Sequence, residues 1–326
     1  MSGHPRGGAL EVVTMGRVGV DLYPLQVGVP LAEVRTFAKS LGGSATNVAV
    51  AAARLGRRSA VVTKVGDDPF GPFVRTALEG FGVDTRWVGT DPELRTPIVF
   101  CEIFPPDHFP LLFYRQPKAP DMNLTPDDLD LDAIAAVPLL WTTGTGLSDE
   151  PSRSTTLAAL AARPRNAVTV HDLDYRPMFW RSQADARELA REALAHATVA
   201  VGNTDEVEMA TGTRDPLDAS AALLDLGASL AVVKRGPDGV LGRTADQVVE
   251  VPPVRVEVLN GLGAGDAFGG ALCHGLLAGF GLKRLLGFAN AAGAIVASRL
   301  ACADDMPTLA EVEALLTADG PVGEVR

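Results

Sequence analysis

Cysteine is scarce in this chain, and the scarcity excludes two classes of protein. The 326 residues include three cysteines, Cys101, Cys273 and Cys302, an odd number without a Cys-x-x-Cys spacing. This pattern provides neither a disulfide framework nor a zinc site, and it predicts a reducing compartment. No apolar run reaches the ~18 residues needed to span a bilayer, and residues 1–9 lack the apolar core of a signal peptide. We therefore expect a soluble cytoplasmic protein that does not bind a membrane.

Positively charged residues are also fewer than negatively charged ones. The chain has 29 lysines and arginines against 40 aspartates and glutamates, a formal net charge of −11, and no basic cluster longer than Arg57-Arg58. This balance argues against nucleic acid as a partner, and an anionic substrate must therefore meet a local cationic pocket. Hydrophobic residues make up 47% of the chain, which allows a large core. The length fits one large α/β domain with an insertion, or two smaller domains.

Short apolar runs alternate with helical patterns along most of the chain. The apolar runs, which predict buried strands, cover 10–15, 59–65, 137–142, 167–173, 198–202 and 229–233. The helical patterns cover 70–81, 152–162, 184–196, 216–226, 264–277 and 282–300. Such alternation indicates a mostly parallel sheet with helices on both faces, in which ligands bind beyond the carboxyl ends of the strands.

Two extended segments, at about 18–38 and 96–116, interrupt this alternation. Within the second segment, the runs 98–104 and 111–115 have the pattern of a hairpin around Pro105-Pro106. We interpret the two segments as a small β lid inserted into the core domain. The alternative is a pair of surface hairpins that cover one edge of the sheet.

A glycine-rich turn followed by a single carboxylate is the most informative stretch of the chain. A strand ending runs through Gly263, Ala264 and Gly265 into an apolar helix, with Asp266 in its first turn. Free N–H groups at a helix start attract negative charge, and glycines let the backbone approach a ligand closely. Phosphoryl transfer to a hydroxyl requires donors for the phosphoryl oxygens and an acceptor for the alcohol proton. The alternative is an ordinary helix start, where the dipole favours an acidic residue by roughly 0.5–1 kcal/mol.

A second glycine turn, Gly42-Gly43, opens an alanine-rich helix that closes near Gly56. A helix that begins on a double glycine leaves its N-terminus open for a ligand. Asn47 would lie one turn into this helix, where its amide can donate to and accept from the hydroxyls of a polyol. Alone, this turn indicates little, because most such turns have no ligand.

Together the two turns resemble the two signatures of the ribokinase-like carbohydrate kinases, the pfkB family. Two further segments resemble family motifs in the expected order: Asn203-Thr-Asp-Glu206 its Asn-x-x-Glu motif and Lys234-Arg-Gly-Pro-Asp-Gly239 its nucleotide loop. The resemblance covers about residues 11–318. It implies a three-layer α/β/α fold with a mostly parallel central sheet and a small β lid.

The resemblance also implies that the chain, as one domain over 1–326, transfers a phosphoryl group from ATP to a sugar hydroxyl. Asp266 would accept the hydroxyl proton while the oxygen attacks the γ-phosphorus, and the N–H groups of the glycine turn would stabilise the transferred group. The family usually has Asp-Thr just before this turn. This chain has Asn260-Gly261 instead, which leaves open whether a monovalent cation binds there.

Further roles implied by the resemblance lie on the nucleotide side. Magnesium would bridge the phosphates, with Asn203 and Glu206 acting mainly through water because Mg²⁺ keeps much of its hydration shell. The alternative is a helix cap for Asn203 beside an exposed Glu206. Asn290 would flank the adenine, or else be a polar residue on the exposed side of an alanine-rich helix. The nucleotide site would be lined by Lys234, Gly236 and Gly239.

The segment 171–180 indicates which substrate the kinase would use. Its Asp-x-Asp-Tyr-Arg-Pro-x-x-Trp pattern resembles the 5-dehydro-2-deoxygluconokinases of myo-inositol catabolism, as do 37–39 and Tyr114-Arg115. These kinases phosphorylate a sugar acid at its terminal hydroxyl. Because a carboxylate substrate needs cations, the candidates are Lys39, Arg115 and Arg176.

Each of these substrate assignments has an alternative. Any single arginine can be a solvated surface charge, and Arg176 can instead pair with Asp172 or Asp174 within the chain. Asp21 resembles the polyol-binding aspartate of the family, but it could also be a turn or cap residue.

Other functions also stay open at this point. A kinase for 2-keto-3-deoxygluconate, fructose or ribose would share the scaffold, but gives less reason for the segment 171–180. A non-catalytic sugar-binding regulator would need the fold but not Asp266. A nicotinamide enzyme is disfavoured, because the first predicted strand is not followed by Gly-x-Gly-x-x-Gly. The family resemblance also allows a homodimer through the lid.

Overall fold

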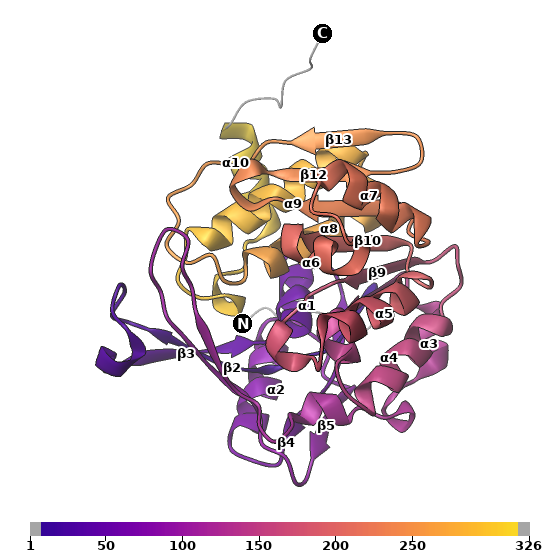
Figure 1. Ribbon diagram of the computed structural model, residues 1–326. Helices are drawn as coiled ribbons and strands as arrows, with labels where there is room; N and C mark the ends of the chain where they lie inside the picture. Colours follow the sequence, from indigo (N-terminus) through magenta and orange to yellow (C-terminus); the bar gives the residue numbers. More distant parts are fainter. Residues whose placement is uncertain (1–7, 319–326) are drawn as a thin grey trace.

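The computed structural model describes residues 8–318, and its central element is a nine-stranded sheet (Figure 1). Neighbouring strands are parallel except for the two pairs that involve β12. Residues 1–7, which belong to the N-terminal segment considered above, lie outside the described residues. In spatial order the strands are β13 (Val248–Val251), β12 (Val240–Arg243), β11 (Leu230–Lys234), β10 (Val199–Asn203), β9 (Val168–Asp172), β8 (Leu139–Thr143), β1 (Val12–Met15), β4 (Ser59–Gly66) and β5 (Val88–Asp91).

The central strands are buried on both faces, which explains their continuous apolar sequences. In β1, Val12 packs into the cluster on one face of the sheet and Val13 into the cluster on the other, and both are fully buried. The six predicted strands are confirmed within two residues at either end. The antiparallel edge pair β12 and β13 was not predicted, because each strand has only four residues and gives no sustained pattern.

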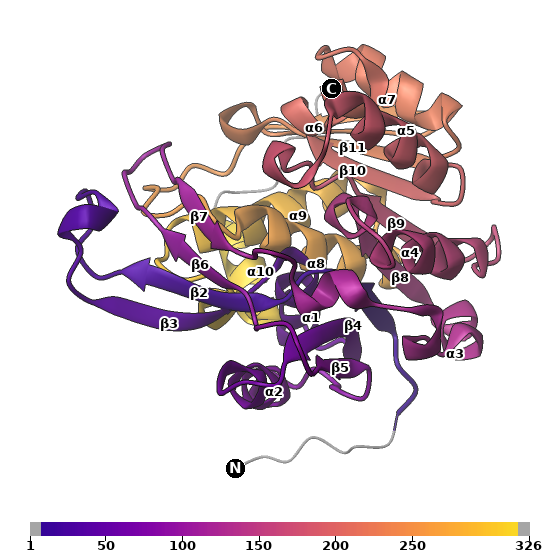
Figure 2. The ribbon, with the colours of Figure 1, turned by 60° about the horizontal axis from the view of Figure 1, so that its bottom comes forward.

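Helices cover both faces of this sheet and make the three layers that the sequence predicts. One face packs against α1, α2, α8, α9 and α10, and the other against α3 to α7 (Figure 2). No helix within residues 8–318 is long and apolar enough to cross a membrane. The helices are α1 (Ser44–Arg54), α2 (Phe70–Gly80), α3 (Leu131–Ala136), α4 (Ser152–Ala161), α5 (Gln183–Leu194), α6 (Thr204–Thr211), α7 (Pro216–Asp225), α8 (Ala264–Leu277), α9 (Leu282–Ala297) and α10 (Leu309–Ala318).

A second, four-stranded sheet projects from one side of the molecule (Figure 1). Its strands in spatial order are β3 (Phe37–Gly42), β2 (Gly19–Pro24), β6 (Ile98–Cys101) and β7 (Leu111–Tyr114). The hairpin expected around Pro105-Pro106 is the antiparallel pair β6 and β7. Strand β3 continues to Gly42, past the expected boundary at 38, so this sheet leads directly into α1. We call these four strands the lid sheet.

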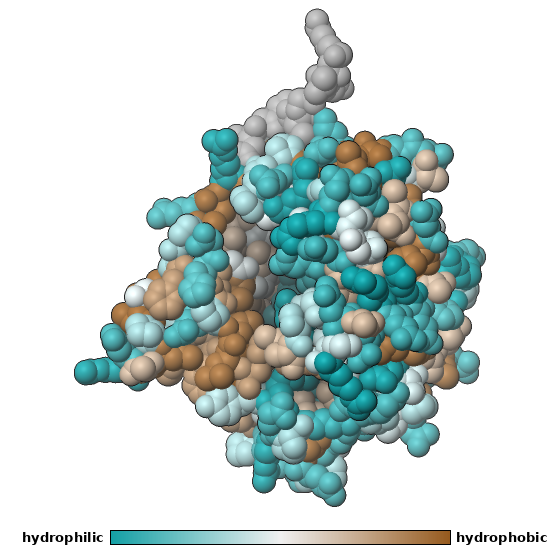
Figure 3. Space-filling model, in the orientation of Figure 1, coloured by the Kyte–Doolittle hydropathy of each residue, from teal (hydrophilic) through white to brown (hydrophobic). Residues whose placement is uncertain are grey.

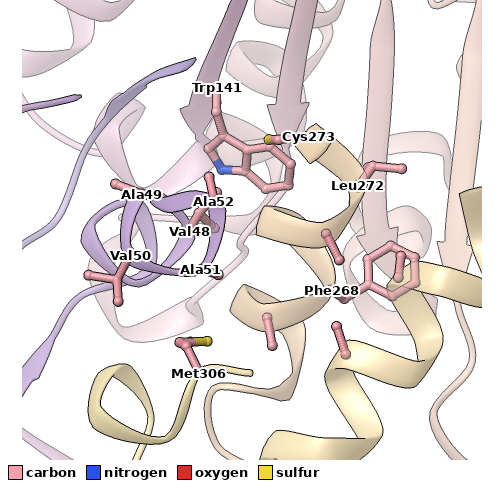
Figure 4. Packing of buried hydrophobic residues seen from close by; sticks show 14 of the residues in the cluster. Val48, Ala49, Val50, Ala51, Ala52, Trp141, Phe268, Leu272, Cys273 and Met306 are labelled. Carbon is pink, nitrogen blue, oxygen red and sulfur yellow. The ribbon is translucent and has the colours of Figure 1, made fainter. Parts of the chain in front are cut away.

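Helices α1 and α8 approach each other closely, and this contact brings the two glycine turns together. A Cβ on Gly270 would lie 2.3 Å from the Cβ of Ala51, and a Cβ on Gly269 would lie 2.8 Å from the Trp141 ring. Figure 4 shows the Trp141 ring between α1 and α8. Because only glycine fits at these crossing points, the two helices can touch near the middle of α1 and the second turn of α8.

We expect Gly270→Ala to lower the free energy of unfolding by about 1–3 kcal/mol, the usual cost of overpacking a core. The added methyl group would push α8 away from Ala51 of α1. The matched control is Gly287→Ala in α9, where a Cβ meets no atom within 4 Å. There alanine should be neutral or should stabilise by up to ~1 kcal/mol. Urea unfolding of both variants is the measurement, and equal stabilities would contradict the proposed contact.

Candidate active site

A cavity lies where the lid sheet meets the starts of α1 and α8. Figure 3 shows the surface hollowed between the apolar lid side and the more polar body of the molecule. The lid sheet supplies apolar walls and the carboxylate of Asp21, and the body supplies the other charged groups. The cavity is lined by Arg17, Asp21, Tyr23, Gly43, Ser44, Asn47, Val99, Cys101, Leu111, Phe113, Arg176, Leu262, Gly263, Asp266 and Cys302.

Asp266 and Asn47 meet in this cavity although they are 219 residues apart in sequence. The Nδ2 of Asn47 donates a hydrogen bond of 2.8 Å to Oδ2 of Asp266, in the first turn of α8. Burial raises the pKa of Asp266 to about 6, although the hydrogen bond from Asn47 opposes the shift. The Oδ1 of Asn47 is buried and has no hydrogen-bond partner within residues 8–318. It can therefore accept a hydrogen bond from a hydroxyl group bound in the cavity.

The glycine turn before α8 leaves backbone N–H groups free beside Asp266. Gly263 caps the helix with φ 79°, and helix geometry gives the first amides no acceptor within the helix. Asn260 holds the loop from below: its Nδ2 donates to the Leu300 carbonyl at 2.7 Å, and its Oδ1 accepts from the Leu262 N–H at 3.0 Å. The residue that departs from the family pattern thus orients the turn.

Asp21 lies in the middle of β2, so its alternative role as a turn or cap residue is wrong. The Tyr23 hydroxyl donates to its Oδ2 at 3.0 Å, and burial raises the pKa of Asp21 to about 6. A Cβ on Gly42 would collide with the Asp21 carboxyl group, and a Cβ on Gly43 would lie 2.4 Å from the Arg17 carbonyl oxygen. The double glycine is therefore required because β2 and the chain before it pass directly over the start of α1.

Arg17, Asp174 and Arg176 form a buried ionic cluster at one end of the cavity. Asp174 lies 3.1 Å from Nη2 of Arg17 and 3.1 Å from Nη2 of Arg176. Ser44 and Thr145 also donate to Asp174, at 2.8 and 2.9 Å. Burial alone would raise the pKa of Asp174, but the two guanidinium groups hold it well below its usual range. The structure thus confirms the alternative in which Arg176 pairs with Asp174.

Sequence reasoning missed Arg17. It follows β1 directly and is 7% exposed, and its position after the first strand was the available signal, because ligands bind beyond the carboxyl ends of parallel strands.

The other two predicted cations, Arg115 and Lys39, do not line the cavity. The Arg115 guanidinium binds the buried Asp121 through two hydrogen bonds, of 2.7 and 3.1 Å, and Arg115 itself is partly buried. The ammonium group of Lys39 lies 3.8 Å from the centre of the Phe73 ring in α2. Their roles in reading a carboxylate stay predictions, and the structure provides each of them with a partner inside the chain.

Lys234 brings a positive charge to the start of α8. It ends β11, and its Nζ is 3.9 Å from Oδ1 of Asp172 and 3.5 Å from the position of a Cβ on Gly265. Burial raises the pKa of Asp172 to about 7, although Lys234 opposes the shift. The loop after Lys234 turns at Gly236 and Gly239, whose φ angles are 56° and 85°.

Asn203 and Glu206 form a capping box at the start of α6. The Asn203 side chain accepts from the Glu206 N–H at 2.9 Å, and Glu206 accepts from the Asn203 N–H at 2.7 Å. The capping alternative therefore describes Asn203, but Glu206 is buried rather than exposed. Asn290 donates to the Pro252 carbonyl at 2.8 Å. Within residues 8–318 no group of three His, Cys, Asp or Glu residues could hold a metal ion.

A buried carboxylate beside free helix-start amides, facing a cavity at the edge of a mostly parallel sheet, is the arrangement of a small-molecule kinase. The model of the pfkB family of carbohydrate kinases matches residues 9–309, and the chain belongs to this family.

Curated relatives and solved structures agree with this family. The 5-dehydro-2-deoxygluconokinase of Geobacillus kaustophilus is 33% identical over 311 residues, which cover 93% of this chain and 92% of the relative. The enzyme of the same name from Shouchella clausii is 31% identical over 315 residues, which cover 95% and 96%. A fructokinase double mutant from Vibrio cholerae, solved with fructose, ADP and a potassium ion, has a TM-score of 0.82 at 28% identity and covers 95% of this chain and 100% of its own.

Proposed function

We propose that this chain is an ATP-dependent kinase that phosphorylates the terminal hydroxyl of 5-dehydro-2-deoxy-D-gluconate, a sugar acid of myo-inositol catabolism. The observation that carries the proposal is the Asp266 carboxylate, held by Asn47 within the free amides of the α8 start and facing the cavity. The names of the curated relatives support this substrate.

Each residue of the cavity has a separate role in this reaction. Asp266 accepts the proton of the terminal hydroxyl, and Asn47 keeps the carboxylate in place while its free Oδ1 accepts from the sugar. Asp21, held by Tyr23, binds further hydroxyls. The amides of Gly263, Ala264 and Gly265 stabilise the negative charge of the group in flight, since such positioned dipoles supply most of the catalysis in phosphoryl transfer.

The residues on the nucleotide side fit a bound phosphate chain. The Nζ of Lys234 lies 3.5 Å from the position of a Cβ on Gly265, so its positive charge can meet a phosphate at the start of α8. When bound, ATP would supply the phosphoryl group, and Mg²⁺ would neutralise the negative charge of the phosphates. Lys234, Gly236 and Gly239 would hold the nucleotide.

Asn290 and the capping box complete this side. Oε1 of Glu206 lies 3.8 Å from Nη1 of Arg176. Asn203 and Glu206 would reach the metal mainly through water, because Mg²⁺ keeps much of its hydration shell. Asn290 holds the backbone at Pro252 and would flank the adenine from there. A monovalent cation stays a prediction, and both polar groups of the Asn260 side chain are used within the chain.

We further propose that the chain acts as one kinase domain and that the lid sheet closes over the sugar. Strands β2, β6 and β7 supply Tyr23, Val99, Cys101, Leu111 and Phe113 to the cavity wall, so a movement of this sheet would cover or open the site. A homodimer through the lid stays a prediction. The exposed side chains that support it are Leu25, Val27, Leu112 and Tyr114.

A panel of substrates with purified protein and Mg-ATP tests the proposal, with ADP release as the measurement. We expect a kcat/KM for 5-dehydro-2-deoxy-D-gluconate at least tenfold above those for 2-keto-3-deoxygluconate, ribose and fructose. A tenfold preference requires only ~1.4 kcal/mol of differential binding in the transition state, which one well-placed contact provides.

The comparison with 2-keto-3-deoxygluconate is the demanding one, because both molecules carry a carboxylate. If the protein prefers that acid or a neutral sugar, the assignment as a sugar kinase still holds, but the proposed substrate is wrong. Tight sugar binding without ADP release from any substrate would instead support the non-catalytic regulator.

A further inference from the structure

Arg17 is a buried arginine whose guanidinium group is only partly used by the protein. Its Nε donates to Thr145 at 3.1 Å, and its Nη2 donates to Ser44 at 3.1 Å and to Asp174 at 3.1 Å. No described residue within 8–318 accepts a hydrogen bond from Nη1. Because Arg17 also lines the cavity, its Nη1 group can donate to a bound ligand.

The protein holds this guanidinium in one orientation before any ligand arrives. Four hydrogen bonds from Nε and Nη2 fix the group, and Asp174 adopts φ 30°, a rare conformation for a residue other than glycine. Backbone strain of this kind persists where the surroundings require one position of a side chain. An arginine that is already ordered loses little entropy when it binds a ligand. Because both hydrogens of Nη2 are already used, the remaining donors are those of Nη1, and a carboxylate is the strongest common acceptor for them.

Contacts with helix α1 show how far Arg17 lies from Asp266, the proposed base. Ser44 accepts from Arg17, and Asn47, three residues later on the same helix, donates to Asp266. Three residues of an α-helix rise by about 4.5 Å, so the two contacts lie roughly one helical turn apart. A sugar acid that places its terminal hydroxyl at Asp266 can therefore extend its other end toward Arg17.

We propose that Arg17 binds the carboxylate of the sugar acid and determines the preference of this kinase for acids over neutral sugars. The proposal rests on the function proposed above. It assigns this recognition to a residue from the turn between β1 and β2, rather than to Arg115, whose guanidinium is already bound by Asp121.

The test compares 5-dehydro-2-deoxy-D-gluconate with its amide, which has the same chain without the charge. For Arg17→Met we expect the ratio of kcat/KM for acid over amide to fall at least tenfold, through a higher KM for the acid. The kcat/KM for the amide should fall less than that for the acid, because the lost carboxylate contact affects only the acid. Arg17→Lys keeps the charge without the guanidinium donors, and it should restore part of the ratio.

Arg115→Met tests the rival assignment, and we expect it to keep the acid-to-amide ratio of wild type. The inference is overturned if Arg17→Met keeps the ratio, or if acid and amide lose activity equally, because Arg17 would then only hold Asp174 in place. Thermal melting and ADP binding check that each variant is folded. If Arg17→Met does not fold, an unchanged ratio in Arg17→Lys overturns the inference equally.

A failure of the proposed function has a different signature. Wild-type protein that neither phosphorylates nor binds the acid would contradict the substrate, and with it the role of Arg17. Wild-type protein that prefers the acid supports the substrate whichever arginine reads it.

Discussion

Asp266→Asn should lower kcat by roughly 10²–10⁴-fold, the range typical for removal of a general base. The asparagine side chain has the same shape and can keep a hydrogen bond to Asn47, but it cannot accept the hydroxyl proton. Folding and nucleotide binding should stay near wild type. Single-turnover ADP formation, thermal melting and ADP binding are the three measurements.

The pH dependence of the wild-type enzyme checks the same assignment independently. Burial raises the pKa of Asp266 to about 6, and the base works only when it is ionised. Activity should therefore be full above this pKa and be lost as pH falls through about 6. More than a tenth of wild-type turnover in Asp266→Asn, or a variant that keeps the acidic limb of the pH profile, would remove Asp266 from the role of base.

Gly263→Ala should lower kcat by roughly 10²-fold or more, comparable with the loss of one donor to a developing charge. A Cβ at Gly263 would lie 2.4 Å from the Cys302 sulfur, and the residue has φ 79°. Cys302 is buried and interacts with the Tyr23 hydroxyl, so it has no room to withdraw. The first turn of α8 must therefore shift, so that its N–H groups no longer point toward the phosphoryl group. Initial rates with saturating sugar and ATP measure the effect.

Gly279→Ala, just past the other end of α8, is the matched control. Gly279 has φ 69°, but a Cβ there meets no atom within 4 Å. Both variants place alanine in the left-handed region, which costs about 1–3 kcal/mol of stability. Only Gly263→Ala should lose activity at a temperature where both are folded. Equal activities of the two variants would mean that the amides of the turn do not contribute to the reaction.

Much of the fold was predictable because it depends on local patterns. Buried strands and amphipathic helices are encoded in the spacing of apolar residues, so the predicted strands of the large sheet and the predicted helices differ from the observed ones by at most three residues at their ends. Short elements escaped for the same reason: α6 and the pair β12 and β13 are too short to show a period.

The candidate base and its glycine turn could also be recognised in the sequence, because both lie in one short segment. Asp266 and its glycine turn are contiguous, and the helix starts at Ala264 as predicted. The capping box of Asn203 and Glu206 is local in the same sense. The sequence did not decide whether such a pair also serves the nucleotide, because that depends on what lies opposite it in space.

The choice among the arginines depended on contacts between distant segments. Arg17 meets Thr145 and Asp174 across 128 and 157 residues, and no local pattern distinguishes it from a solvated arginine. Arg115 was a reasonable candidate until folding placed Asp121 against it.

The longer elements, the glycine turns and the carboxylate could be derived from the residues alone, because backbone preference and side-chain chemistry are local properties. Only the tertiary structure decided which charges share the cavity, because burial and pairing of a charge depend on the elements that pack around it.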